Sequence, residues 1–219
     1  MGEDSSAVRG RYLGRLVLEL LPDGRLMQLL EPFGFLDENQ VRWPVPARAQ
    51  VDGASIPRPL WSLMGGPFEG KYRDASVIHD YYCDTRRRPW RKVHRVFYNA
   101  MRVSGTNETL AKLMYAGVLF GGPRWSDTVE HNVNLPPPDL NMLFSVAHSE
   151  FEKGVIAAVY MKDKTSAPHN LEEHLVLPNG KVEALDLEKM KSLIAENNPS
   201  LDEIEKAVDV AWKLRQWTR

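Results

Sequence analysis

The chain of 219 residues has a formal net charge of -1, with 43% hydrophobic and 26% charged residues, a profile typical of a soluble globular protein that can build its own core. Near-neutral charge excludes a general nucleic-acid binder, because such a protein needs a surplus of cations to displace counterions from phosphates. The only cysteine, Cys83, excludes an intramolecular disulfide framework and gives no sign of a thiolate zinc site, so we interpret it as a buried spacer.

The sequence contains no predicted transmembrane segment and no predicted secretory signal. No window approaches the roughly 18 apolar residues that a membrane helix needs, and residues 1–10 place Glu3 and Asp4 among small residues where a signal would have an apolar run. We therefore expect synthesis in the cytoplasm, with export without a signal or incorporation into a phage particle left open.

Short β-prone runs separated by turn residues predict a small antiparallel sheet in the N-terminal part of the chain. The runs cover Tyr12–Leu21, Leu26–Leu30 and Phe33–Leu36. Pro22-Asp23-Gly24 predicts a hairpin turn between the first two runs, because glycine takes positive φ at little cost. Proline cannot donate to a strand ladder, so we expect Trp43-Pro44-Val45-Pro46 to form an edge that leads into a loop.

Three helices are expected after residues 51–72, a Gly- and Pro-rich stretch that predicts an ordered, irregular loop. The helices are predicted over Arg73–Cys83, Pro89–Val103 and Asn107–Phe120. The middle helix carries an apolar stripe that marks the face it buries. The stripe consists of Val93, Val96, Phe97, Ala100 and Met101. For the basic run Arg86-Arg87-Arg88 with Arg91 and Lys92, we favour a solvated connection between helices over a phosphate or headgroup contact.

A domain boundary is expected after the third helix, where Gly121-Gly122-Pro123 is followed by Pro136-Pro137-Pro138. We divide the chain into a first domain, a Pro-rich linker and a mainly helical C-terminal region. These parts cover residues 1–125, 126–138 and 139–219.

The C-terminal region is predicted to contain three helices and a short hairpin. The helices cover Leu140–Lys162, Leu185–Glu196 and a segment that begins at Ser200, and the hairpin covers Leu175–Glu183. Ser200 and Glu203 can cap each other's amides at the start of the last helix, and Ile204, Val208, Ala211 and Trp212 lie on one of its faces. The predicted fold class is α+β, with a small N-terminal antiparallel sheet packed on a mainly helical core, followed by this region.

The adjacent pair His79-Asp80 and the preceding segment Asp52-Gly53-Ala54-Ser55 are the residues best suited to chemistry. A hard cation such as Ca²⁺ takes about six to eight oxygens, and Asp80, Asp52 and loop carbonyls can supply several. His79 is then free to act as general base toward a water beside the polarised substrate carbonyl. This hypothesis needs Asp52 to approach the helix of His79 and the imidazole to reach a water-accessible hollow. The alternative is structural, with His79 packing the helix and Asp80 bonding a backbone amide.

Several separate motifs in the first domain carry a family resemblance. They are Val51-Asp52-Gly53-Ala54-Ser55-Ile56-Pro57, Trp61, Gly70-Lys71-Tyr72-Arg73-Asp74-Ala75-Ser76-Val77-Ile78-His79-Asp80-Tyr81, Phe97, Met101, Gly105 and Phe120-Gly121. In this order they resemble the bacterial and phage family catalogued as domain of unknown function 1353, over about residues 11–125. A shared order of motifs is more specific than any one of them. The resemblance implies no established activity.

The loop with Asp52, the helix with His79-Asp80 and the following helix with Phe97 also resemble secreted prokaryotic and fungal phospholipase A2. That resemblance implies that His79 activates water, that Asp80 and Asp52 bind Ca²⁺, and that the substrate is a lipid or another acyl compound. Those enzymes orient the imidazole with a carboxylate, but the aligned residue here is His94. A neutral histidine can accept the proton on His79 but cannot stabilise a developing imidazolium as a carboxylate would.

The histidine at position 94 opens another metal hypothesis. His79, Asp80 and His94 could together bind Zn²⁺ or Mn²⁺, because imidazole suits these metals far better than it suits calcium.

Ser55, Trp61 and Tyr82 are the candidate substrate contacts. We interpret Ser55 as a hydroxyl that caps a turn and not as a nucleophile, because it lacks a Gly-x-Ser-x-Gly context. Trp61 and Tyr82 could line an acyl-binding cleft, although aromatic residues at such spacing are more often part of a core.

Two functions are therefore expected to compete. The first is a metal-assisted hydrolase of ester or amide bonds, which is compatible with a phage-related or delivered effector protein. The second is a non-catalytic phage or prophage protein, in which the same residues lock a loop to a helix and residues 139–219 bind a protein partner.

Overall fold

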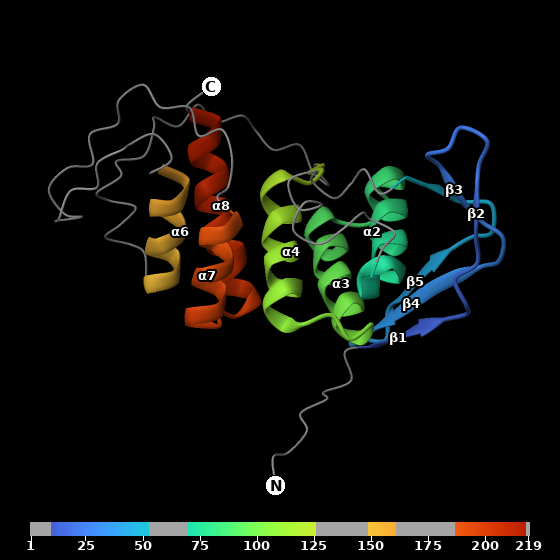
Figure 1. The fold of residues 1–219 in the computed structure, drawn as a ribbon, viewed down its shortest axis with the longest axis horizontal. Coiled ribbons are helices and arrows are strands. Elements are labelled where there is room, and N and C mark those ends of the chain that lie inside the picture. The colour runs from blue at the N-terminus through green and yellow to red at the C-terminus, as the bar shows by residue number, and fades with distance from the viewer. Residues whose placement is uncertain (1–9, 53–69, 126–148, 161–186, 218–219) are drawn as a thin grey trace, which may run out of the picture. The chain divides into compact units, whose positions relative to one another are not determined.

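The chain divides into two compact units, Met1–Thr128 and Val129–Arg219. The computed structural model describes residues 10–52, 70–125, 149–160 and 187–217. Small antiparallel sheets and helices make up these residues, which confirms the predicted α+β class (Figure 1). None of the helices in these four ranges is long and apolar enough to span a membrane.

Short strands in the described part of the first unit form two antiparallel three-stranded sheets, ordered β1-β4-β5 and β2-β3-β6. The strands are β1 (Gly10–Leu13), β2 (Leu18–Leu20), β3 (Met27–Leu29), β4 (Phe33–Asp37), β5 (Arg42–Val45) and β6 (Gln50–Val51). β2 and β3 pair with Leu18 opposite Leu29, which confirms the predicted hairpin. Pro44 lies in β5 at the edge of its sheet, as expected for a residue without a ladder donor.

The run predicted over Tyr12–Leu21 is not one strand, and the single expected sheet is two. Gly14 breaks the run with a φ of +83°, and a Cβ at this position would lie 2.9 Å from the Pro32 carbonyl oxygen. Glycine is the residue that tolerates such a backbone at little cost. β1 and β2 therefore leave Gly14 in different directions and join different sheets.

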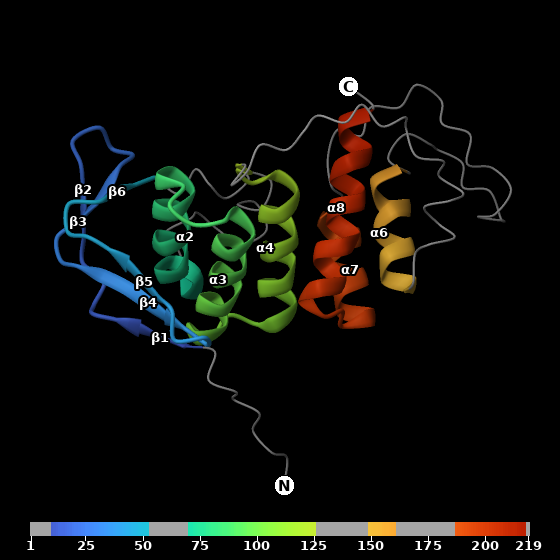
Figure 2. The same ribbon diagram turned by 180° about the vertical axis from the view of Figure 1, so that it is seen from behind.

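The described helices of the first unit are η1 (Gly70–Tyr72), α2 (Arg73–Thr85), α3 (Trp90–Val103) and α4 (Glu108–Gly121). α3 lies between α2 and α4 in both views of the fold (Figures 1 and 2) and also contacts β1 and β4. The predicted apolar stripe of α3 is buried throughout. α2 is buried over every residue from Ala75 to Cys83, so its polar residues in that stretch lie in the interior.

The connection from α2 to α3 is a short turn with defined ends. α2 ends where Arg86 adopts a left-handed backbone with a φ of 52°, and the Arg86 N–H donates to the Tyr82 carbonyl at 3.0 Å. Pro89 then precedes the first residue of α3. This turn packs α2 against α3 and brings the residues of the candidate site together.

The described part of the second unit contains α6 (Glu150–Tyr160), α7 (Leu187–Asn197) and α8 (Leu201–Trp217), with α6 against both of the others. The predicted capping box is confirmed, because the Ser200 N–H donates to Glu203 at 2.8 Å and the Glu203 N–H donates back to the Ser200 hydroxyl at 3.3 Å. The hairpin predicted over Leu175–Glu183 lies outside the described residues.

Candidate active-site cavity and its buried histidine pair

Asp52 and Asp80 meet although they lie 28 positions apart. Asp52 follows directly after β6, and Asp80 lies on α2. The Asp52 N–H donates to the Asp80 Oδ2 at 2.8 Å, and Asp80 is only 7% exposed. The first spatial requirement of the hydrolase hypothesis, the approach of Asp52 to the helix of His79, is therefore met by the backbone of Asp52.

The Asp52 carboxylate is paired with Arg25, which lies in the turn between β2 and β3. The Arg25 Nε donates to Asp52 Oδ2 at 3.1 Å, and the terminal nitrogen of the guanidinium contacts the same oxygen. The Arg25 side chain is 71% exposed, so this pair contributes little to stability but places a positive charge beside the carboxylate.

A cavity of about 440 Å³ borders these carboxylates. The polar groups in its wall belong mainly to α2 and to the residue after β6. They include Asp52, Asp80, Cys83 and Asp84, and Arg86 and Pro123 also line the cavity. Carboxylate oxygens are the ligands that hard divalent cations prefer, so the cavity offers a suitable donor set on one side of a space large enough for a small organic group.

Behind this wall, His79 and His94 form a buried pair between α2 and α3. His79 Nε2 and His94 Nδ1 are 2.7 Å apart, and both residues are 0% exposed. The His79 ring stacks on Phe97 with 4.5 Å between ring centroids. The Cys83 Sγ lies 3.5 Å from His79 Nε2, so Cys83 both borders the cavity and contacts the imidazole.

Burial keeps both imidazoles neutral. It lowers the pKa of His79 well below 6.5, and the neighbouring His94 lowers this pKa further. Burial also lowers the pKa of His94 to about 3, with smaller contributions in the same direction from Arg124 and Arg91 and an opposing one from the Pro123 backbone. In such a neutral pair one ring donates the shared proton and the other accepts it.

The outer side of His94 is a cationic and aromatic layer. Trp90 meets the His94 ring edge-on at 5.5 Å, and the guanidinium groups of Arg91 and Arg124 lie 4.4 and 4.6 Å from the Trp90 ring centroid. His94 Nε2 is buried without a hydrogen bond of normal geometry, although the Pro123 backbone lies near enough to raise the pKa.

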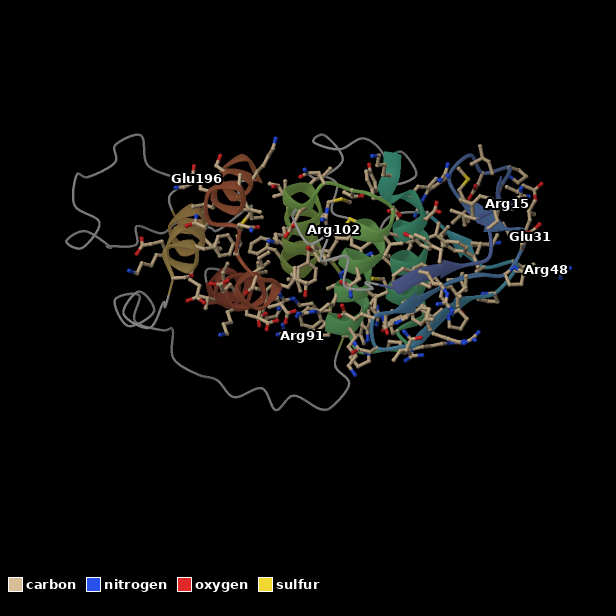
Figure 3. The ribbon with its side chains drawn as sticks, turned by 90° about the horizontal axis from the view of Figure 1, so that it is seen from below. Arg15, Glu31, Arg48, Arg91, Arg102 and Glu196 are labelled. Atoms are coloured by element: carbon tan, nitrogen blue, oxygen red, sulfur yellow. The ribbon has the colours of Figure 1, made fainter. Side chains whose placement is uncertain are left out.

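Arg91 lies apart from three other charged side chains of the unit that are labelled in Figure 3. Figure 3 shows Arg91 near the helices and Arg15, Glu31 and Arg48 grouped on the side of the strands. The positive charge beside His94 therefore comes from residues close to it, Arg91 and Arg124.

The structure brings together most of the predicted site residues that it describes. Tyr82 is the exception, because its hydroxyl donates to the Pro44 carbonyl at 3.1 Å and its ring contacts Trp43, which ties α2 to β5. Ser55 and Trp61 lie outside the described residues. The second spatial requirement, an imidazole that reaches a water-accessible hollow, is not met in this structure, because His79 is 0% exposed.

Cys83 and Asp84 are the residues that the sequence analysis did not assign to the site. Their signal is the spacing of four along α2, which places Cys83 on the face of His79 and Asp84 on the face of Asp80.

The sequence segment that contains the histidine pair and most of the cavity lining matches a known family. Residues 27–118 match the family model described as "Protein of unknown function (DUF1353)". This segment of the chain is therefore similar to the DUF1353 family. The resemblance recognised in the motifs is confirmed for this segment, which includes Asp52, Asp80, Cys83 and both histidines.

Two relatives of this chain come from Sinorhizobium fredii. "Uncharacterized protein y4jT" is 50% identical over 101 residues, which is 46% of this chain and 30% of that protein. "Uncharacterized protein y4iH" is 41% identical over 122 residues, which is 55% of this chain and 51% of that protein. The chain thus matches about half of one relative and less than a third of the other. No solved structure matches the chain significantly.

Proposed function

We propose that the first unit of this chain is a cation-assisted hydrolase of ester or amide bonds, with a lipid-like or other acyl compound as its substrate. The observation that carries the proposal is the meeting of Asp52 and Asp80 at the wall of a cavity of about 440 Å³. Residues from separate elements that converge on a cavity, beside titratable groups with shifted pKa values, are typical of a reactive site.

The donor set at the cavity fits a hard divalent cation such as Ca²⁺. Asp52, Asp80 and Asp84 offer carboxylate oxygens, and the Arg25 guanidinium already holds a positive charge against Asp52. Because Arg25 is largely exposed, its side chain can swing into solvent when a cation takes that place. A cation bound there would polarise the carbonyl of the substrate.

His79 is the candidate base, because a base must be neutral to accept a proton. The required tautomer has the proton on His79 Nε2, donated to His94 Nδ1, so that the lone pair lies on His79 Nδ1. That nitrogen is 3.9 Å from the Cys83 Sγ. Since His79 is fully buried, neighbouring side chains must move before a water from the cavity can reach the lone pair, and Cys83 is the neighbour that also lines the cavity. His94 then orients the ring, as a neutral partner.

The test is a hydrolysis screen with phospholipid vesicles, water-soluble esters and amides, run with added Ca²⁺, Mn²⁺ or a chelator. His79→Ala and Asp80→Asn should each lower the rate more than about 100-fold, the usual lower limit for loss of a general base. Cys83→Ala, which opens the path to His79, is the matched control and should keep or raise the rate. Equal rates of hydrolysis in wild type and His79→Ala would contradict the proposed function.

One observation favours a second candidate, a non-catalytic phage or prophage protein. The Asp80 carboxylate accepts the Asp52 N–H, and each imidazole has the other as partner, so the same residues hold the segment after β6 against α2. The second unit would then bind a protein partner. For this candidate we expect no hydrolysis of any substrate in the screen. We also expect Asp80→Ala to unfold at a lower urea concentration than wild type.

A further inference from the structure

Three metal-ligating side chains form a buried cluster inside the first unit. His79 and Cys83 lie one turn apart on α2, and His94 comes from α3. One ligand atom from each, the two imidazole nitrogens and the thiol sulfur, lie within 4.8 Å of one another, and all three residues are buried.

We propose that His79, Cys83 and His94 bind one borderline divalent metal ion, with Zn²⁺ as the preferred ion. Two imidazole nitrogens and one thiolate are the donors that zinc takes in proteins, whereas calcium takes oxygens. The cluster thus differs in chemistry from the carboxylates of the cavity. It also differs from a set of His79, Asp80 and His94, because the third donor is the sulfur of the one cysteine in the chain.

Two of the three separations between donor atoms are close to those around a tetrahedral zinc ion, and all three lie within 4.8 Å. Zn–N distances of about 2.05 Å and a Zn–S distance of about 2.3 Å place a nitrogen and a sulfur about 3.6 Å apart, and two nitrogens about 3.3 Å apart. The Cys83 Sγ and His79 Nε2 are 3.5 Å apart, and the two imidazole nitrogens are 2.7 Å apart. The two rings must therefore separate by only about 0.6 Å to admit the ion.

The surroundings of the cluster can complete the coordination. Cys83 borders the cavity, so a water from the cavity can fill the fourth tetrahedral position. Binding through His94 Nδ1 leaves the ring proton on Nε2, the buried atom without a regular partner, and the Pro123 backbone is the neighbouring acceptor for it. A ligating histidine usually donates its other N–H to such a group.

This inference does not rest on the proposed hydrolase. A metal at His79 Nε2 requires the proton on Nδ1, while the base requires the opposite tautomer. Metal binding at the cluster and proton transfer through His79 therefore exclude each other within one molecule, and the two proposals fail on different measurements.

The test is a titration of the chelator-treated full chain with Co²⁺, which takes zinc sites and reports their ligands by absorption. A phosphine reductant keeps the thiol reduced without competing for metal. Because Cys83 is the only cysteine, a thiolate-to-cobalt charge-transfer band can arise only from that residue. We expect one Co²⁺ per chain, tetrahedral d–d bands, the charge-transfer band, and loss of all of them when Zn²⁺ is added.

Matched variants locate the site. Cys83→Ser should abolish the charge-transfer band, and His94→Gln should weaken binding more than about tenfold, the lower limit even for loss of a supporting residue. Glu31→Gln, at an exposed position on the side of the strands, changes neither the cluster nor the cavity wall and should leave the band intact. Absence of the charge-transfer band in folded wild-type protein overturns the proposal whatever the variants do. Hydrolysis by a protein that lacks the charge-transfer band would contradict the proposed metal cluster and leave the proposed hydrolase standing.

Discussion

Acidification should destabilise the metal-free protein through its buried histidine pair. A histidine whose pKa is lower in the folded than in the unfolded chain takes up its proton on unfolding. Its contribution to stability is therefore complete above the unfolded pKa of 6.5 and is lost as the pH falls below that value. His79 and His94 both have lowered pKa values, so both act in this direction.

The magnitude follows for His94, whose folded pKa is about 3. At pH 4.5 the unfolded side chain is protonated and the folded one is not. Each of the two pH units between 6.5 and 4.5 lowers the free energy of unfolding by about 1.4 kcal/mol. A small part of this loss is already present at pH 7, where some unfolded chains carry a protonated His94. The free energy of unfolding should thus fall by about 2.5 kcal/mol between pH 7 and pH 4.5 from His94 alone.

Urea unfolding at pH 7, 6, 5 and 4.5, with chelator present, measures this change. His94→Gln is the control, because glutamine can still bond to His79 but does not titrate. The carboxylates of the chain titrate in both proteins, so the difference between the two curves isolates the histidine. Wild type should lose about 2.5 kcal/mol more than the variant. Parallel curves would refute the argument that burial holds His94 neutral.

Three further perturbations test the surroundings of the cavity. Asp80→Ala should lower the free energy of unfolding by about 1–3 kcal/mol, because the partly buried Asp52 N–H loses its hydrogen bond to a charged acceptor. Asp80→Asn retains an acceptor and should cost clearly less in the same urea experiment. Arg25→Gln should tighten Ca²⁺ binding in calorimetry, because no guanidinium competes for the carboxylate, and unchanged affinity would contradict the assigned cation position. Phe97→Ala should cost about 3–5 kcal/mol, since the fully buried ring packs on His79, and a cost near zero by thermal unfolding would show that the stack does not support the pair.

Local sequence signals predicted much of the fold. The Asp23-Gly24 turn, the apolar stripe of α3 and the Ser200 capping box are set by residues within a few positions of one another, and each is present as expected. The break at Gly14 was missed, because a glycine within a β-prone run does not show which carbonyl will lie beside it. Only the folded chain places Pro32 at that point.

The candidate site was predictable in its parts more than in its arrangement. Asp52, His79, Asp80 and His94 could be chosen from motif order, but whether an imidazole faces water depends on how α2 packs against α3 and the sheets. The role of Cys83 as a candidate metal ligand could not be predicted from the sequence, because one cysteine matches no ligand pattern by itself. It gains a role only when a histidine from another helix reaches the same point.

Through the ion pair between Arg25 and Asp52, the hairpin of β2 and β3 influences the charge at the cavity. Arg25 lies in a surface turn where substitutions are easily tolerated. Its guanidinium nevertheless partly neutralises the carboxylate of Asp52, the residue whose backbone N–H donates to Asp80. Exchange of this single exposed residue would alter the negative charge available to a cation or an anionic substrate without disturbing any helix. Substitutions in the hairpin turn are thus a way for related domains to favour different ligands at little cost in stability.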